Sequence, residues 1–191
     1  MSGPVLVQRP SPFERMAKTV AVLLGIIVSV AALGSVLLPS SARAAPPSPV
    51  YIHMNGANEF LERLVFVRPG QKVVFVNEDT GPHAIRGYDQ KTGVQSKTFY
   101  KPVIMGTPGA QHPPHTYTIS FPHQGAQHYY CPVHAYIAKG PGGVWLPVRR
   151  PTTHGFGAAM AGTIVVTDDK ALLADNPATA SKKILSNFFG G

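Results

Sequence analysis

Cysteine is the scarcest informative residue in this 191-residue sequence, because Cys131 is its only thiol. A single cysteine excludes an internal disulfide and a zinc module built from several cysteines. In an exported protein an unpaired thiol is open to oxidation, so its presence favours a thiolate that holds a metal. The alternative interpretation at this point is a buried structural cysteine.

Charged residues are also scarce, at 14% of the chain with nine Asp and Glu in total. The 17 Lys and Arg give a formal net charge of +8, but they are scattered, and no basic run alternates with aromatics, so nucleic acid is not the expected partner. The positive charge favours an anionic membrane face or an acidic protein. The sequence has no glycine-rich phosphate loop, no serine nucleophile elbow and no zinc-hydrolase motif.

Long helical patterns are rare, whereas Gly and Pro number 19 each. Such a density of turn residues predicts many short strands and therefore an all-β sandwich. A Pro69-Gly70 turn separates two of the expected strands, and residues 94–102 are expected to form a loop with a weak strand. The other predicted strands alternate or are continuously apolar: 49–54, 63–67, 72–77, 115–121, 127–131 and 162–167.

The N-terminal residues 1–44 have the order of an export signal. Three basic residues precede an apolar run over 19–38, and Ala42-Arg43-Ala44 fits a cleavage site. The apolar run is longer than a typical signal core and can span a bilayer, so a signal peptide and a membrane anchor both remain open. Either one sends residues 45–169, the main domain, to an extracytoplasmic, periplasmic location. Residues 170–191 are predicted to be a short amphipathic tail.

Three segments carry the chemistry. His83 follows a predicted strand and a turn, Cys131 ends a strand with His134 three residues further on, and Met160 opens the last strand. Taken singly, His83 could be a turn residue, His134 a surface histidine and Met160 a core residue. Together they supply two imidazoles, one thiolate and one thioether, which are the ligands of a type 1 copper site for electron transfer.

The segments around these ligands resemble the cupredoxin family. The resemblance rests on Phe75-Val-Asn-Glu-Asp-Thr-Gly-Pro-His83, on Tyr130-Cys-Pro-Val-His134 and on Met160-Ala-Gly-Thr-Ile-Val-Val166, and it covers roughly residues 50–167. It implies a Greek-key β-sandwich with one copper ion that cycles between Cu(I) and Cu(II). It further implies an electron carrier, not an enzyme, whose partners are a cytochrome or a membrane oxidase of a respiratory chain.

One departure from the family concerns the spacing of the ligands. The second histidine and the methionine usually lie a few residues apart, whereas 26 positions separate His134 from Met160. Either His134 binds the metal or His154 does, and the common Cys-x-x-His spacing favours His134. The insert 135–159 is rich in Gly and Pro and is expected to be a long loop that borders the copper. Its Arg149 and Arg150 are expected to contribute to docking of an acidic partner.

Two other classes of function remain open. The first is a copper-binding or copper-trafficking protein without a redox role, against which the strand-borne Cys131 argues. The second is a small copper enzyme with an open coordination position, against which Met160 argues because it fills the axial position.

Overall fold

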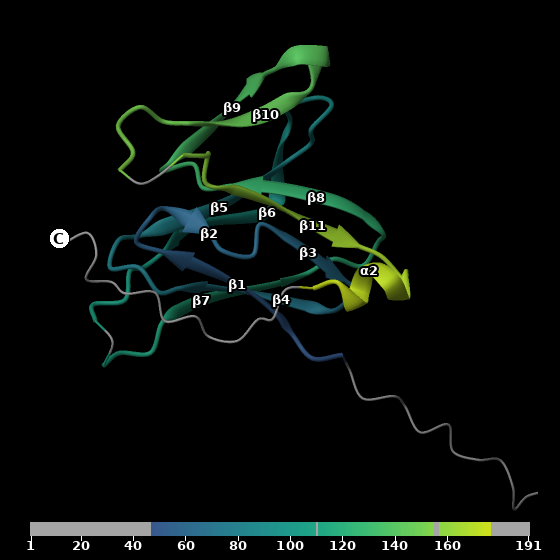
Figure 1. Ribbon diagram of the computed structural model, residues 1–191, viewed down its shortest axis with the longest axis horizontal. Coiled ribbons are helices and arrows are strands. Elements are labelled where there is room, and N and C mark those ends of the chain that lie inside the picture. The colour runs from purple at the N-terminus through teal and green to yellow at the C-terminus, as the bar shows by residue number, and fades with distance from the viewer. Residues whose placement is uncertain (1–46, 110, 155–156, 177–191) are drawn as a thin grey trace, which may run out of the picture. The chain divides into compact units, whose positions relative to one another are not determined.

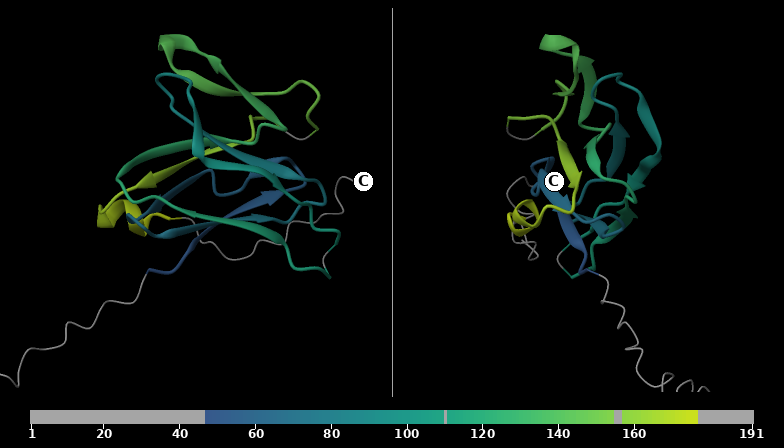
Figure 2. Two further views of the ribbon diagram at one scale, coloured as in Figure 1. Left: turned by 180° about the vertical axis from the view of Figure 1, so that it is seen from behind. Right: turned by 90° about the vertical axis from the view of Figure 1, so that its right-hand side faces the viewer.

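The computed structural model describes residues 47–109, 111–154 and 157–176 (Figure 1). The expected signal or anchor and residues 177–191 of the expected tail lie outside this part of the chain. Within it, no helix is both long and apolar enough to cross a membrane. The described residues form two facing sheets and a separate strand pair, so the predicted all-β Greek-key sandwich is confirmed (Figures 1 and 2).

The first sheet has the strand order β2-β1-β4-β7. Its two central strands run parallel, and both outer pairings are antiparallel. The chain crosses from this sheet to the other after β4, returns after β6 and crosses again after β7, and these crossings give the sandwich its topology. The strands are β1 (Val50–Asn55), β2 (Glu59–Phe60), β4 (Lys72–Asn77) and β7 (His115–Ser120).

The second sheet has the order β3-β11-β8-β5-β6. One of its strands, β5, was not expected, because the sequence predicted a turn around His83, and the ten-residue β6 replaces what was predicted as a loop with a weak strand. Their pairing has register shifts, which explains why neither segment shows a regular alternation. The strands are β3 (Leu64–Val67), β5 (His83–Tyr88), β6 (Gln95–Ile104), β8 (Gly125–Tyr130) and β11 (Ala161–Val166).

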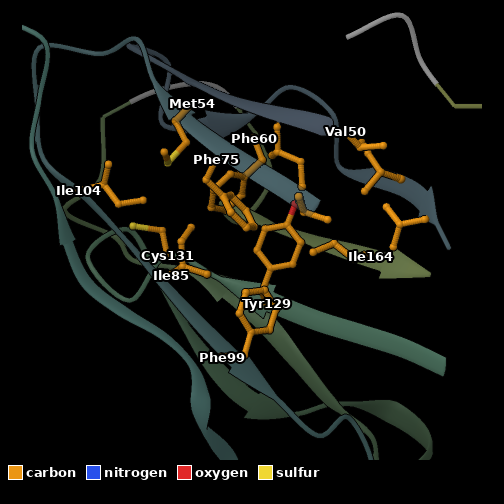
Figure 3. Packing of buried hydrophobic residues seen from close by; sticks show 14 of the residues in the cluster. Val50, Met54, Phe60, Phe75, Ile85, Phe99, Ile104, Tyr129, Cys131 and Ile164 are labelled. Carbon is orange, nitrogen blue, oxygen red and sulfur yellow. The ribbon is translucent and has the colours of Figure 1, made fainter. Parts of the chain in front are cut away.

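Aromatic side chains from both sheets fill the space between them (Figure 3). The Phe75 ring meets the Tyr129 ring edge-on with centroids 5.2 Å apart, and the Phe60 ring meets Tyr129 in the same way at 4.9 Å. Such edge-to-face pairs are a preferred aromatic geometry. Cys131 belongs to this same core and lies at one end of it (Figure 3), so the thiol is attached to a tightly packed scaffold.

The C-terminal segment begins with a short helix, α2 (Lys170–Ala174), as its amphipathic pattern predicts. The Asp169 side chain caps this helix by accepting hydrogen bonds from two backbone N–H groups. Just beyond it, the amide of Asn176 accepts from the Phe66 N–H and donates to the Phe66 carbonyl. This side chain therefore occupies the hydrogen-bonding edge of β3, the outermost strand of the second sheet.

The insert is not the long loop that its composition predicts. Residues 135–149 form an antiparallel hairpin, called here the insert hairpin, from β9 (Ala135–Lys139), a 3₁₀ turn (Pro141–Gly143) and β10 (Trp145–Arg149). Proline is tolerated in β10 because both strands of a two-stranded sheet are edge strands. Gly142 and Gly143 have positive φ angles of 74° and 79°, a conformation that glycine adopts without strain.

The insert hairpin covers the outer face of the second sheet as a third layer. Tyr130 follows Tyr129 in β8 and points to the opposite face, where it forms a second apolar cluster with Tyr88 and Ala135. Ile137 and Trp145 of the insert hairpin pack against this cluster. The hairpin, which Figure 1 shows as a separate strand pair beside the second sheet, is thus anchored by a small apolar cluster.

Candidate metal centre

The predicted ligands come together because three neighbouring strands start or end at the same place. In the order β11-β8-β5, strand β5 begins at His83, β8 ends one residue before Cys131, and β11 begins one residue after Met160. Both pairings are antiparallel, so the start of one strand lies beside the end of its neighbour. The Cys131 N–H donates to the Met160 carbonyl at 2.9 Å, which joins two of these ends directly.

Three donor side chains converge at this point. Cys131 Sγ lies 3.9 Å from His83 Nδ1 and 3.5 Å from His134 Nδ1. For a first-row ion such as zinc, bonds of about 2.3 Å to sulfur and 2.0 Å to nitrogen at trigonal angles put the two ligand atoms about 3.7 Å apart. The observed separations bracket this value. The donor atoms of all three residues lie within 4.8 Å of one another, so the cluster can hold one metal ion.

The residue types narrow the choice of metal. A thiolate favours Cu(I), imidazoles suit Cu(II), and the combination of two imidazoles with one thiolate is the equatorial set of a type 1 copper site. The side chains of Cys131 and His83 are buried, at 0% and 1% exposure, and His134 is half-buried. The cluster can therefore bind a copper ion in a site that is largely shielded from water, with one edge near the surface.

Of the two candidates for the second histidine, the structure brings His134 to the thiol. The chain turns directly after Cys131, whose carbonyl accepts from the N–H groups of His134 and Ala135 at 3.1 and 2.8 Å. This tight turn returns the His134 ring to the sulfur. His154 is exposed and is not part of the cluster, although its carbonyl accepts a hydrogen bond from Asn58.

Met160 lies beside the cluster at the start of β11. Met160 is 2% exposed and belongs to the same apolar core as Cys131. The backbone bond between the two residues keeps the methionine adjacent to the thiol. Its service as a weak axial ligand stays a prediction.

The surroundings of Cys131 favour the thiolate. Burial by itself raises the pKa of this thiol, but hydrogen bonds from His134, His83 and the Ala84 N–H outweigh it and lower the pKa to about 6. The Ala84 N–H donates to the sulfur at 3.4 Å. Since a thiolate is the form that binds a metal, the site is prepared for binding near neutral pH.

Asp79 is a functional residue that the sequence interpretation missed. Its Oδ2 lies 2.9 Å from His83 Nε2, the nitrogen that faces away from the thiol. Burial lowers the pKa of His83, but the hydrogen bonds to Asp79 and Cys131 raise it more, so the net direction is upward. A histidine ligand in proteins commonly donates its second ring N–H to a carboxylate in this way. The sequence signal that could have identified this contact is the position of Asp79, four residues before His83 in the turn that precedes it.

The loop that carries Asp79 is fixed by Asn77 at the end of β4. The Asn77 amide donates to the carbonyls of Gly81, Ile104 and Met105 at 2.9–3.0 Å, and its oxygen accepts from the Asp79 N–H at 3.0 Å. A buried amide with so many partners makes a rigid connection between the two sheets. Asp79, and through it the His83 ring, is therefore oriented from the opposite sheet.

Comparisons with known proteins give similarity in structure only. No family model matches the sequence. No curated protein matches it either. Among solved structures, the chain is similar to a purple cupredoxin from Nitrosopumilus maritimus, with 19% identity over 63% of this chain and 100% of that one and a TM-score of 0.41.

It is also similar to amicyanin from Paracoccus versutus, with 17% identity over 65% of this chain and 86% of that one and a TM-score of 0.39. These scores are low. The strand order and the His83–Cys131–His134 cluster carry the conclusion that the chain is a β-sandwich with a candidate copper site.

Proposed function

We propose that this protein is an extracytoplasmic electron carrier that uses one type 1 copper ion. The observation that supports the proposal most strongly is the convergence of two imidazole nitrogens on a buried sulfur at the end of a packed core. Copper, when bound, supplies a one-electron couple. The residues of the chain hold the ligands in one arrangement that suits both oxidation states, and they exclude water from the sulfur.

The burial of the cluster favours electron transfer over copper trafficking or catalysis. A trafficking site has to give up its metal and an enzyme has to admit a substrate, and both need access. Here Cys131 and His83 are enclosed, and only His134 approaches the surface. An electron needs no opening, so a half-buried imidazole edge is sufficient for transfer to a partner.

Spectra of the copper-loaded protein test this proposal. We expect an intense charge-transfer band from the Cys131 thiolate, and Cys131→Ser should abolish it. His134→Ala should remove or strongly alter the band, whereas the matched variant His154→Ala should leave it intact. A reversible one-electron wave in voltammetry is the second expected result. A band that survives in Cys131→Ser, or bound copper without a reversible couple, would overturn the electron-carrier assignment.

The partner is proposed to be an exported respiratory protein, either a cytochrome or a membrane oxidase. Arg149 and Arg150 were expected to guide it, but both hold the backbone near the site. Arg150 Nε donates to the Pro132 carbonyl at 3.0 Å, and the Arg149 guanidinium donates to the Thr153 carbonyl. Reversing these charges would disturb the site as well as the surface, so they are poor probes of docking.

The exposed residue Met105 is a better probe. It directly follows Ile104, which pairs with His83, so it lies near the proposed copper, and it is 58% exposed. Met105→Lys should slow electron transfer to a cytochrome that the wild type reduces. The matched control Val94→Lys changes an exposed residue in the turn at the other end of β5 and β6 and should have no effect. Equal rates for both variants would exclude docking at this surface.

A further inference from the structure

The insert hairpin makes contacts with the second sheet at both of its ends. At the first end, Arg150 follows β10 and its N–H donates to the His134 carbonyl at 3.0 Å. The Thr153 hydroxyl donates to the same carbonyl at 3.2 Å, and the Arg150 guanidinium donates to the Pro132 carbonyl. Residues 131–134 are called here the ligand loop. The carbonyls of Pro132 and His134 in this loop thus accept hydrogen bonds from residues that follow the hairpin.

At the second end, Trp145 contacts the turn between β5 and β6. The backbone N–H of Trp145 donates to the Gln90 carbonyl at 2.8 Å. A Cβ added to Gly93 would lie 2.5 Å from the Trp145 ring, so the indole lies directly on the backbone of this turn. Gly93 also has a positive φ angle of 75°, which a side chain would strain. The contact therefore depends on a glycine at this position.

Between these ends, the insert hairpin packs on Tyr88 and Tyr130, whose strands lead directly to the metal site. Strand β5 runs from His83 to the turn that Trp145 contacts, and β8 leads into Cys131. Strand β9 starts at the residue after His134, so the ligand loop and the hairpin share a continuous backbone. The hairpin is therefore directly connected to His134.

We propose that the insert hairpin is a positioning element that holds the ligand loop in its metal-binding arrangement before any metal binds. Without it, residues 132–134 would be a surface loop whose carbonyls are bonded to water and whose imidazole is free to turn away from the sulfur. With it, Arg150 and Thr153, which directly follow the hairpin, are placed to donate to the His134 carbonyl, and the distant Trp145 contact keeps the hairpin in place. Thr153 and Trp145 are the positioning residues. This inference relies on the proposed function only in naming His134 as a copper ligand.

Amide hydrogen exchange in the metal-free protein tests the proposal directly. The reporter is the Ala135 N–H, which is bonded to the Cys131 carbonyl inside the ligand loop turn. Thr153→Val removes one hydrogen bond at constant shape and should speed the exchange of this amide about fivefold. The matched control Thr152→Val changes its exposed neighbour and should leave the rate unchanged.

The distant contact is tested in the same way. Trp145→Ala should speed exchange at Ala135 about tenfold or more, although the change lies at the other end of the insert hairpin. Val148→Ala changes an exposed residue of the same hairpin and serves as its control. In the copper-loaded protein, Thr153→Val and Trp145→Ala should change the copper hyperfine splitting, whereas both controls should match the wild type.

Unchanged exchange at Ala135 in Thr153→Val and in a folded Trp145→Ala variant would overturn the proposal. If Trp145→Ala unfolds the whole domain, the Thr153→Val and Thr152→Val pair decides alone. Faster exchange in the metal-free variants together with a wild type that shows no copper band would support the positioning role and reject the proposed function. The two ideas therefore fail separately.

Discussion

Two buried histidines in this protein each lie against a carboxylate, but only one belongs to a metal site. His83 is 1% exposed with Nε2 2.9 Å from Asp79, and His53 is 3% exposed with Nδ1 3.2 Å from both oxygens of Glu62. Among the residues that the structure describes, only the His83 side has a thiol and a second imidazole within reach. Burial with a carboxylate partner thus orients a histidine, while the converging sulfur and nitrogen make the metal site.

The carboxylates differ in their task as well. Glu62 is itself 2% exposed and also accepts the His53 backbone N–H at 2.8 Å, so this pair joins β1 to the segment after β2 inside the core. Burial raises the pKa of Glu62, but the hydrogen bonds and charge of His53 lower it more. A buried pair of this kind is costly to break, because the remaining partner stays uncompensated. The His53–Glu62 pair is a structural feature.

Replacing each histidine by glutamine is the sharpest test of the difference between the His83 and His53 sites. His83→Gln removes an imidazole from the donor cluster and should weaken copper binding by more than about 100-fold. His53→Gln should leave the copper spectrum unchanged but lower the free energy of unfolding by about 3 kcal/mol, since Glu62 loses its partner. Copper titration and chemical unfolding measure the two effects. A copper spectrum altered in His53→Gln would show that the two regions are coupled.

The acidity of the thiol gives the next largest effect. The pKa of Cys131 lies at about 6, against 9.0 for an ordinary cysteine. We expect the ultraviolet absorbance of the thiolate in the metal-free protein to grow as pH rises through about 6, so that thiolate dominates at pH 7. His134→Ala should move this midpoint upward, because it removes a hydrogen bond to the sulfur. A wild-type midpoint near the ordinary value of 9.0 would contradict the arrangement of donors around the sulfur.

Asp79→Asn separates orientation from ligation on the His83 side. The amide keeps a hydrogen bond to the ring but loses the negative charge, so copper affinity should fall about 10- to 100-fold while copper still binds. Asp175→Asn, at an exposed helix end, is the charge-matched control and should have no effect. Affinity equal to that of the wild type would mean that Asp79 only fixes the loop.

The smallest expected effect concerns Met160. Met160→Gln should keep copper bound and lower the reduction potential, because a stronger axial donor stabilises Cu(II). Each tenfold gain in preference for Cu(II) lowers the potential by about 59 mV. Val94→Gln, an exposed change at the other end of β5 and β6, is the control. An unchanged potential would assign Met160 to the core alone.

The insert shows where sequence reasoning failed. Its Gly and Pro content argued against a central strand, and the structure has none there, but the same content permits a hairpin of two edge strands. The insert hairpin packs on Tyr130, which lies shortly before it in the chain, and on Tyr88 of β5, which is far from it in sequence. No local pattern in the insert predicts that partner surface.

The sequence by itself determined the all-β class, and its ligand signals predicted the residues of the His83–Cys131–His134 cluster. Alternation of apolar residues marks strands locally. The ligand signals are local as well: a lone cysteine with a histidine three residues further on, and a methionine directly before an apolar strand. Tertiary structure alone showed that His134, and not His154, lies beside the thiol, that Asp79 partners His83, and that the insert hairpin packs on the second sheet. These depend on which strand ends are neighbours in a sheet, and that is set by packing between segments distant in the chain.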